Sequence, residues 1–372
     1  MLKKPSNLYF LVALLVIFCS LFSRVNAIDV SAKSAILIES ESGEVIYEKN
    51  ANIPMPMAST TKIMTAIIAI ENNSLNDIVK IPKEAVGIEG SSIYLKEGEA
   101  LTVYELLEAL LLESANDASV ALAYKTSGDV SSFATLMNQK ASELGLTNTH
   151  FTNPHGLDDK EHYTTAKDLA IITAYAMKIP VFSDIVSTYK AEIPLNDGAG
   201  TRVLVNHNKL LRSYKGANGV KTGYTKRSGR CFVSSAEIDG VKLIGVTLNA
   251  PNDWLDHENM LSYGFENYTS HSLAKEGEYL IELDIANGKK STVLASNDSP
   301  FSITLKNGSH DFSAKLEYDS SLSAPINKGD TLGKIVFYDG EEKIGEIKLK
   351  SQETIKENKL NFFERLFKHG KN

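Results

Sequence analysis

Residues 59–73 read STTKIMTAIIAIENN, and this stretch decides the fold of the N-terminal part of the chain. From Ile63 to Ile70 it carries no charge, and a long element that is apolar all round predicts a helix buried in a large core. Ser59 then lies near the N-terminus of that helix, with Lys62 one turn further along the same face. The first amides of a helix have no intrahelical partners, so they can stabilise an anion or a developing oxyanion.

Ser59 and Lys62 form a Ser-x-x-Lys pair at this helix start. A lysine there is partly desolvated, which favours its neutral form, and a neutral amine beside a hydroxyl can act as a general base. The same pattern recurs at residues 187–190, but Pro194 follows it and interrupts any helix. Taken alone, the pair fits equally well with a helix N-cap followed by a surface lysine.

A second motif, Ser114-Ala115-Asn116, falls between two predicted helices. Thr102 and Glu105 form a capping-box pattern that begins the first helix, and residues 117–123 have the character of the next. A tight turn between them would present the Ser114 hydroxyl and the Asn116 amide. Both residue types also favour helix ends, so a simple pair of caps is the alternative.

A third motif, Lys221-Thr222-Gly223, lies in a predicted strand, and a hairpin with an Asp239-Gly240 turn follows it. Such a strand at a sheet edge can pair with an extended peptide. Lys221 and Thr222 can hold a carboxylate, while Gly223 leaves room for close approach. An ordinary exposed strand is the alternative, but the order and spacing of all three motifs favour a catalytic site.

In this order the three motifs are the signature of penicillin-binding proteins and class A β-lactamases, with Ala115 where that signature has Asp. The chain resembles the low-molecular-mass penicillin-binding proteins, which are serine-type D-alanyl-D-alanine carboxypeptidases, over about residues 30–270, and the resemblance implies a C-terminal β-domain as well. Other segments that look like the family's are 153–157, 164–168, 206–211 and 260–265.

The resemblance implies a role for each motif residue. Ser59 becomes the acylated nucleophile and Lys62 its base. Ser114 and Asn116 become the proton relay and the substrate-orienting group. Lys221 would contact the substrate carboxylate or a β-lactam.

The resemblance also implies an oxyanion hole, formed by the backbone amides of Ser59 and Tyr224. Thr222 and Gly223 join Tyr224 as substrate-binding residues. His155 is a weaker candidate for a role next to the catalytic groups, since a buried structural histidine is an equally good interpretation. No metal or other cofactor is implied.

The predicted function is removal of the terminal D-alanine from peptidoglycan stem pentapeptides during cell-wall maturation, through an acyl-enzyme that β-lactams also form. A β-lactamase-like hydrolase is one alternative, but it needs a carboxylate that drives water onto the acyl-enzyme. No clear Glu-x-x-x-Asn follows Ser114, because Glu143 and Asn148 have the wrong spacing. A non-catalytic β-lactam sensor or wall-binding protein stays open.

The N-terminal segment 1–27 predicts a secretory signal peptide: lysines, an apolar run, and an alanine-ended cleavage site at Ala27. We therefore expect an exported protein at the outer face of the bacterial cytoplasmic membrane. Cleavage removes three basic residues and no acids, moving the formal net charge from -7 to -10. Only Cys231 remains, which excludes a disulfide within the mature monomer. The acidic balance argues against nucleic-acid binding.

The mature chain is too long for one typical domain. Residues 28–270 predict an α+β catalytic domain of the β-lactamase/transpeptidase-like kind, in which buried helices combine with an antiparallel sheet. Residues 275–350 contain short alternating runs between Asn-Gly and Asp-Gly turns, which predict a small all-β domain.

The last segment, 352–372, predicts an amphipathic tail that contacts the membrane surface. Apolar residues from Ile355 to Phe367 recur at helical spacing among basic ones, a pattern suited to a helix in a membrane interface. The alternatives are a frayed tail and a helix packed on the β-domain.

Overall fold

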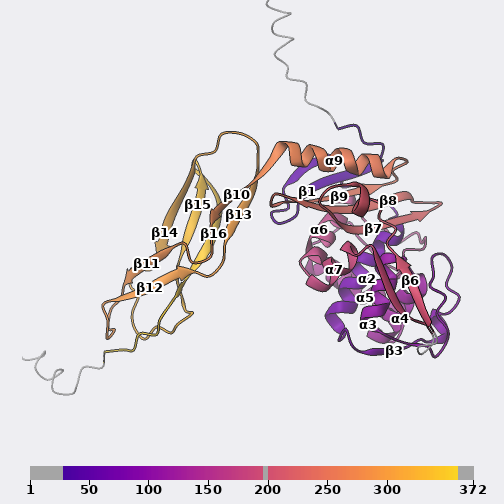
Figure 1. Ribbon diagram of the computed structural model, residues 1–372, viewed down its shortest axis with the longest axis horizontal. Coiled ribbons are helices and arrows are strands. Elements are labelled where there is room, and N and C mark those ends of the chain that lie inside the picture. Colours follow the sequence, from indigo (N-terminus) through magenta and orange to yellow (C-terminus); the bar gives the residue numbers. More distant parts are fainter. Residues whose placement is uncertain (1–27, 196–199, 359–372) are drawn as a thin grey trace, which may run out of the picture. The chain divides into compact units, whose positions relative to one another are not determined.

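A sheet of five strands, in the order β2-β1-β9-β8-β7, forms the frame of the N-terminal unit (Figure 1). β1 pairs antiparallel with β2 and β9, and β7 pairs antiparallel with β8. The strands are β1 Ser34–Glu39, β2 Val45–Lys49, β7 Ala217–Thr225, β8 Gly229–Ile238 and β9 Val241–Leu248. Asp239 and Gly240 join β8 to β9 with φ values of 50° and 82°, as the predicted hairpin turn requires.

This computed structural model describes residues 28–195 and 200–358. The chain divides into two units, of which the first runs to Gly264 and leaves out the turn 237–242, while the second comprises that turn and the chain from Phe265 onward. The predicted signal peptide, 1–27, lies outside the described residues.

Helices cover both faces of the first sheet (Figure 1). They are α2 Lys62–Asn72, α3 Val103–Leu112, α4 Asn116–Ser127, α5 Val130–Glu143, α6 Ala166–Met177, α7 Pro180–Ser187, α8 Leu210–Ser213 and α9 Asp253–Asn267. Shorter elements are the 3₁₀ turns η1 Ala58–Thr61 and η2 Lys83–Ala85 and the hairpins β3 Ile78–Lys80 with β4 Ala100–Thr102 and β5 Lys190–Leu195 with β6 Gly200–Val205.

Strand β1 shows how the sheet separates these helices. Ile36 and Ile38 point into the main core, whereas Leu37 points to the other face, where it meets α9 at Gly264. All residues of β1 are buried, and successive side chains of a strand point to opposite faces of the sheet. The strand therefore contributes apolar side chains to the packing on both faces. The buried helix predicted after Ser59 is α2, whose residues from Lys62 to Ala69 are all buried. The structure confirms the predicted α+β arrangement.

The second unit is all-β, as predicted. A five-stranded sheet in the order β11-β12-β16-β15-β14 lies with a two-stranded ribbon, β10-β13. The strands are β10 Tyr268–Ala274, β11 Leu280–Asp284, β12 Thr292–Asn297, β13 Phe301–Lys306, β14 Phe312–Tyr318, β15 Thr331–Asp339 and β16 Glu342–Ser351. Its core includes Val293, Leu349 and the stacked rings of Phe301 and Phe337, 4.7 Å apart. Strand β10 begins before residue 275, so the unit includes residues that the sequence interpretation assigned to the first domain.

The start of the predicted tail belongs to this β unit. Ile355 is 2% exposed, lies in the core and forms a bridge with Ile326. Because residues 352–358 follow β16 without forming a helix, the predicted apolar stripe cannot begin at Ile355. The rest of the tail, 359–372, lies outside the described residues.

Within residues 28–195 and 200–358, no single helix has both the length and the apolar character needed to cross a membrane; α6 and α7 meet that test only as a pair bent by 104°.

Candidate active site

Ser59 lies in the 3₁₀ turn η1, and α2 begins only at Lys62, so the helix starts later than the sequence pattern predicted. Ala58 has a φ of 50°, and the hydroxyl of Thr61 donates to the Ala58 carbonyl at 2.7 Å. The hydroxyl of Thr60 donates in the same way to Met57, 2.6 Å away. Such local bonds compete with helical ones and keep the turn tight.

The side-chain nitrogen of Lys62, Nζ, lies at the centre of the site. Its side chain is fully buried, and Nζ lies 3.0 Å from Ser59 Oγ, 2.7 Å from Asn116 Oδ1 and 2.6 Å from the His155 carbonyl oxygen. Burial, and then the nearby Lys221, hold the pKa of Lys62 well below its ordinary value, while Asp117 opposes the shift.

These contacts fix how a neutral Lys62 would point. The oxygens of Asn116 and His155 can only accept, so they take the two N–H bonds of a neutral amine. The nitrogen lone pair is then left for the Ser59 hydroxyl, which donates to it. This is the arrangement of a general base beside a nucleophile.

Ser114 lies in the turn between α3 and α4, as the motif predicted, and Asn116 is the first residue of α4. Ser114 has a φ of 60°, an uncommon backbone conformation outside glycine, and its hydroxyl has no hydrogen-bond partner among the described residues. Asn116 turns Oδ1 to Lys62 and donates from Nδ2 to the Glu89 carbonyl oxygen. The capping box of the preceding helix is present, with Thr102 and Glu105 bonded in both directions.

Strand β7 brings the third motif to the same place. Lys221 is 1% exposed and donates to the Thr222 carbonyl oxygen at 3.0 Å. Burial lowers the pKa of Lys221 to about 7, and Glu113 opposes the shift. A Cβ added to Gly223 would lie 2.8 Å from the backbone nitrogen of Ser59, so this approach of β7 to η1 requires glycine.

An open cleft lies in front of these groups. It is lined by Ser59, Ser91, Ser114, His207, Thr222, Gly223, Tyr224, Arg230, Asp253 and Trp254. Five of these residues were not predicted from the sequence to be site residues: Ser91, His207, Arg230, Asp253 and Trp254. His207 lies in a segment that resembles the family, whereas the other four carry no local pattern that could have identified them.

Two histidines near the site differ in how they contribute. The backbone carbonyl of His155, not its ring, contacts Lys62, and the ring nitrogen Nδ1 accepts from the Leu157 amide at 3.1 Å. Burial and Lys62 lower the pKa of His155 to about 3, which keeps the ring neutral. His207 lies in the cleft, 3.3 Å from Glu113, and burial followed by Lys221 lowers its pKa.

Comparison with known proteins gives one consistent family. The sequence matches the D-alanyl-D-alanine carboxypeptidase family, Peptidase_S11, over residues 22–252, and the C-terminal domain family of penicillin-binding protein 5 over residues 268–357. The chain is 35% identical to D-alanyl-D-alanine carboxypeptidase DacF of Bacillus subtilis (strain 168), over 90% of this chain and 88% of that protein.

Solved structures give the same likeness. Penicillin binding protein 5 from Haemophilus influenzae has a TM-score of 0.70 at 29% identity and covers 88% of this chain and 98% of its own. A peptidoglycan synthesis regulatory factor (PBP3) from Streptococcus pneumoniae has a TM-score of 0.75 at 25% identity, covering 88% of this chain and 100% of its own.

Proposed function

Because this chain belongs to the D-alanyl-D-alanine carboxypeptidase family, peptidase S11, we propose that Ser59 is its acylated nucleophile and Lys62 the base. The observation that carries this assignment is the set of contacts at Lys62 Nζ. Two obligate acceptors and a serine hydroxyl surround a buried amine, which leaves its lone pair for the Ser59 proton.

The proposed substrate is the D-Ala-D-Ala terminus of a peptidoglycan stem peptide. Ser59 Oγ attacks the carbonyl carbon between the two D-alanines while Lys62 Nζ accepts the hydroxyl proton. The amides of Ser59 and Tyr224 hold the oxyanion, an arrangement supported by the tight approach of Gly223 to Ser59. The C–N bond then breaks, and the proton passes to the leaving amine through Lys62 and the Ser114 hydroxyl, which faces the cleft.

Water completes the cycle by attacking the ester carbonyl while Lys62 takes its proton. Lys62 passes that proton to Ser59 Oγ as the ester C–O bond breaks, which releases the shortened peptide and restores the Ser59 hydroxyl. A β-lactam follows the first half of this course, since its ring amide presents a carbonyl to the same nucleophile. Lys221 and Thr222 supply the cation and the hydroxyl that a carboxylate of either ligand needs.

We propose further that the protein is exported and works in the cell envelope, at the outer face of the cytoplasmic membrane. The sequence of residues 1–27 supports export, and a substrate that forms the cell wall lies outside that membrane. Sequencing of the mature N-terminus should give Ile28. An uncleaved N-terminus on the exported protein would contradict the signal peptide.

Mass spectrometry after treatment with penicillin tests the nucleophile. We expect one adduct, on the peptide that contains Ser59, and release of free D-alanine from a pentapeptide. Ser59→Ala should lose both, whereas Ser187→Ala, in the second Ser-x-x-Lys sequence at 187–190, should keep both. An adduct that persists in Ser59→Ala would reject the assignment.

A further inference from the structure

One wall of the cleft is a segment without helix or strand, residues 89–99, named here the cleft loop. It contributes Ser91 to the lining of the cleft. Its carbonyls also hold Asn116: the Ser91 oxygen accepts from the Asn116 backbone amide at 2.7 Å, and the Glu89 oxygen accepts from the side-chain amide. The loop thereby sets which way the Asn116 side chain faces Lys62.

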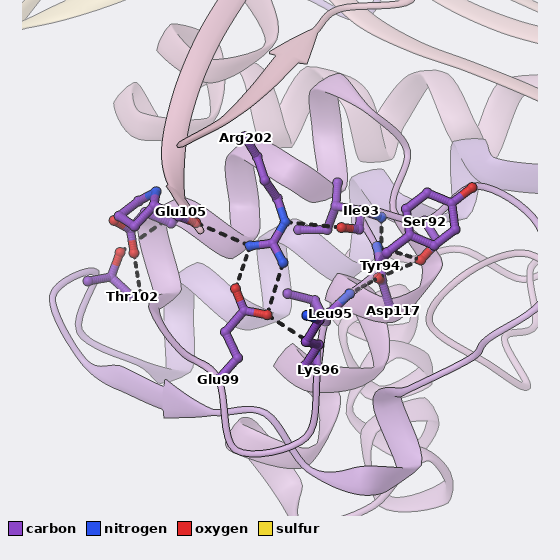
Figure 2. A network of polar contacts seen from close by, with 11 residues as sticks. Ser92, Ile93, Tyr94, Leu95, Lys96, Glu99, Thr102, Glu105, Asp117 and Arg202 are labelled. Atoms are coloured by element: carbon purple, nitrogen blue, oxygen red, sulfur yellow. Dashed lines mark hydrogen bonds and ion pairs between the residues drawn. The ribbon is translucent and has the colours of Figure 1, made fainter. Parts of the chain in front are cut away.

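Asp117 binds the middle of the cleft loop, residues 92–95. Its Oδ2 accepts from the Ser92 hydroxyl at 2.6 Å and from the Leu95 amide at 3.0 Å, and its Oδ1 accepts from the Ile93 amide at 3.3 Å. Figure 2 shows these contacts together with a second carboxylate, Glu99, at the far end of the loop.

Arg202, on strand β6, links the middle of the cleft loop, at Ile93, to its far end, at Glu99. Its guanidinium forms a two-pronged pair with Glu99, in which Nη2 lies 2.9 Å from Oε2 and Nη1 bonds Oε1, and its Nε donates to the Ile93 carbonyl at 3.1 Å (Figure 2). Nη1 also donates to Pro194 of the same hairpin. The two side chains are 10% and 1% exposed, so the pair is shielded from water. A planar guanidinium fixes direction as well as distance.

We propose that Arg202 and Glu99 are positioning residues, which hold the cleft loop against Asn116 and so keep water away from Lys62 and its contact with Ser59. This inference rests on the proposed roles of Ser59 and Lys62. Burial is the largest cause of the lowered pKa of Lys62. If the loop loosens, water reaches the amine, its pKa rises, and a smaller fraction is neutral at a given pH.

Acylation should slow at low pH, where Lys62 becomes protonated, and we call this part of the pH profile the acid limb. The pH at which the acid limb lies therefore reports whether the cleft loop is held in place. The titratable groups that act on Lys62 are Lys221 of β7, Asp117 of α4, and His155 and His162 of the segment between α5 and α6. The substitutions below leave all of them in place. If the midpoint of the acid limb rises by about one pH unit, acylation at a pH below that midpoint becomes about tenfold slower.

The test uses the full mature chain and a fluorescent penicillin, with acylation rates measured across the pH range. Arg202→Met should move the acid limb to higher pH, but it also leaves the buried Glu99 carboxylate without its guanidinium, which destabilises the fold. The double variant Glu99→Gln/Arg202→Met removes that buried charge. We expect it to melt at a higher temperature than Arg202→Met and still to show the shifted limb, because the link to Ile93 is lost in both.

Glu71→Gln is the matched control. Glu71 also forms an ion pair, with its Oε2 2.9 Å from Lys140 Nζ, but it is more exposed than Glu99 and lies at the far end of α2 from Lys62. The acid limb of acylation by the Glu71→Gln variant should lie at the same pH as that of the wild type. A wild-type limb in the double variant would overturn the inference.

A second readout does not depend on acylation. Hydrogen exchange at the amides of Ile93, Leu95 and Asn116 should be faster in the double variant than in Glu71→Gln. If penicillin does not acylate the wild type, that result counts against Ser59 as the nucleophile. Hydrogen exchange alone would then decide whether Arg202 and Glu99 hold the cleft loop. Unchanged exchange at these amides would reject it.

Discussion

In the proposed mechanism, one of the two buried lysines of the site is the base and the other contacts the anionic ligand. Lys62 is surrounded by acceptors that direct its lone pair to Ser59, whereas Lys221 has the Thr222 carbonyl as its hydrogen-bond acceptor within the described residues. An approaching carboxylate adds a negative charge beside Lys221 and so favours its protonated form. Binding of an anionic ligand and protonation of Lys221 are therefore linked.

This linkage predicts an alkaline limb for binding. The pKa of Lys221 is about 7 in the free site, so above that pH the lysine loses its charge and the affinity for a carboxylate falls. Lys221→Arg should flatten the limb, because arginine stays charged at every accessible pH. The measurement is the acylation rate by penicillin at subsaturating concentration against pH. An alkaline limb that persists unchanged in Lys221→Arg would assign it to another group.

The sequence identified the residues whose spacing is local and overlooked those that the fold assembles. Ser59 and Lys62 are three positions apart, so their contact follows from any helical turn, whether 3₁₀ or α. Arg230 and Trp254 reach the cleft from β8 and α9, and no short pattern marks either. The later start of α2 also escaped prediction, since it depends on hydroxyl-to-backbone bonds within the turn itself.

Strand β7 approaches turn η1 closely at the site. Gly223 faces the backbone nitrogens of Ser59 and Thr60, at 2.8 Å and 3.1 Å from the position of an added Cβ. Backbone atoms cannot rotate away as a side chain can. The strand and the turn must therefore separate if any side chain is introduced, and the proposed oxyanion hole lies between them.

Gly223→Ala should therefore keep the fold but slow acylation, by roughly 100-fold or more if it disables one oxyanion donor. Gly200→Ala is the matched control, because a Cβ there would meet only the end of Leu195 at 3.7 Å. Penicillin acylation and melting temperature should be compared for both. Equal acylation rates in the two variants would remove the argument for close approach.

In the β unit, His310 joins the turn after β13 to the end of β15. Its Nδ1 lies 2.6 Å from Asp339 Oδ2 and its Nε2 lies 3.0 Å from the Lys306 carbonyl oxygen, so both nitrogens face acceptors. The imidazolium form satisfies both, and the hydrogen bond to Asp339 is the largest cause of the raised pKa of His310.

The sign of the pH effect follows from that shift. The contribution of His310 to stability is complete below its ordinary pKa, near 6.5, and is lost as pH rises through the higher folded value. The ring protons of His310, followed by NMR in the full chain, should titrate above 6.5, and Asp339→Asn should lower the midpoint. A midpoint that does not move in Asp339→Asn would contradict the pairing.

Seen across the whole chain, sequence patterns located the units better than the ends of elements. Alternating runs at 279–284, 301–305 and 334–338 and Asp-Gly turns predicted an all-β unit, and the strands β11, β13 and β15 correspond to these three runs in turn. Strand β14, which is mostly exposed, lacks a clean apolar alternation and was not predicted. Ile355 was assigned to a membrane helix because its spacing fits one, although tertiary packing places it in a core.

The burial of Ile355 sharpens the prediction for membrane attachment. Any membrane stripe must come from residues 359–372, whose aromatic and basic residues suit an interface with anionic lipid. Deleting 359–372 should release the mature protein from anionic liposomes, with activity on a free pentapeptide and melting temperature unchanged. Deleting 352–372 should also release it, but should destabilise the β unit by about 2–5 kcal/mol or more, since it removes a core isoleucine.

Co-sedimentation of the mature protein and both truncations, at low and high salt, separates the two effects. High salt should weaken binding of the full chain, because part of its attraction to anionic lipid is electrostatic and screened. Recovery of all three proteins in the supernatant at low salt would reject attachment through the tail. Loss of stability already on deletion of 359–372 would instead mean that this segment packs on the β unit, as Ile355 does.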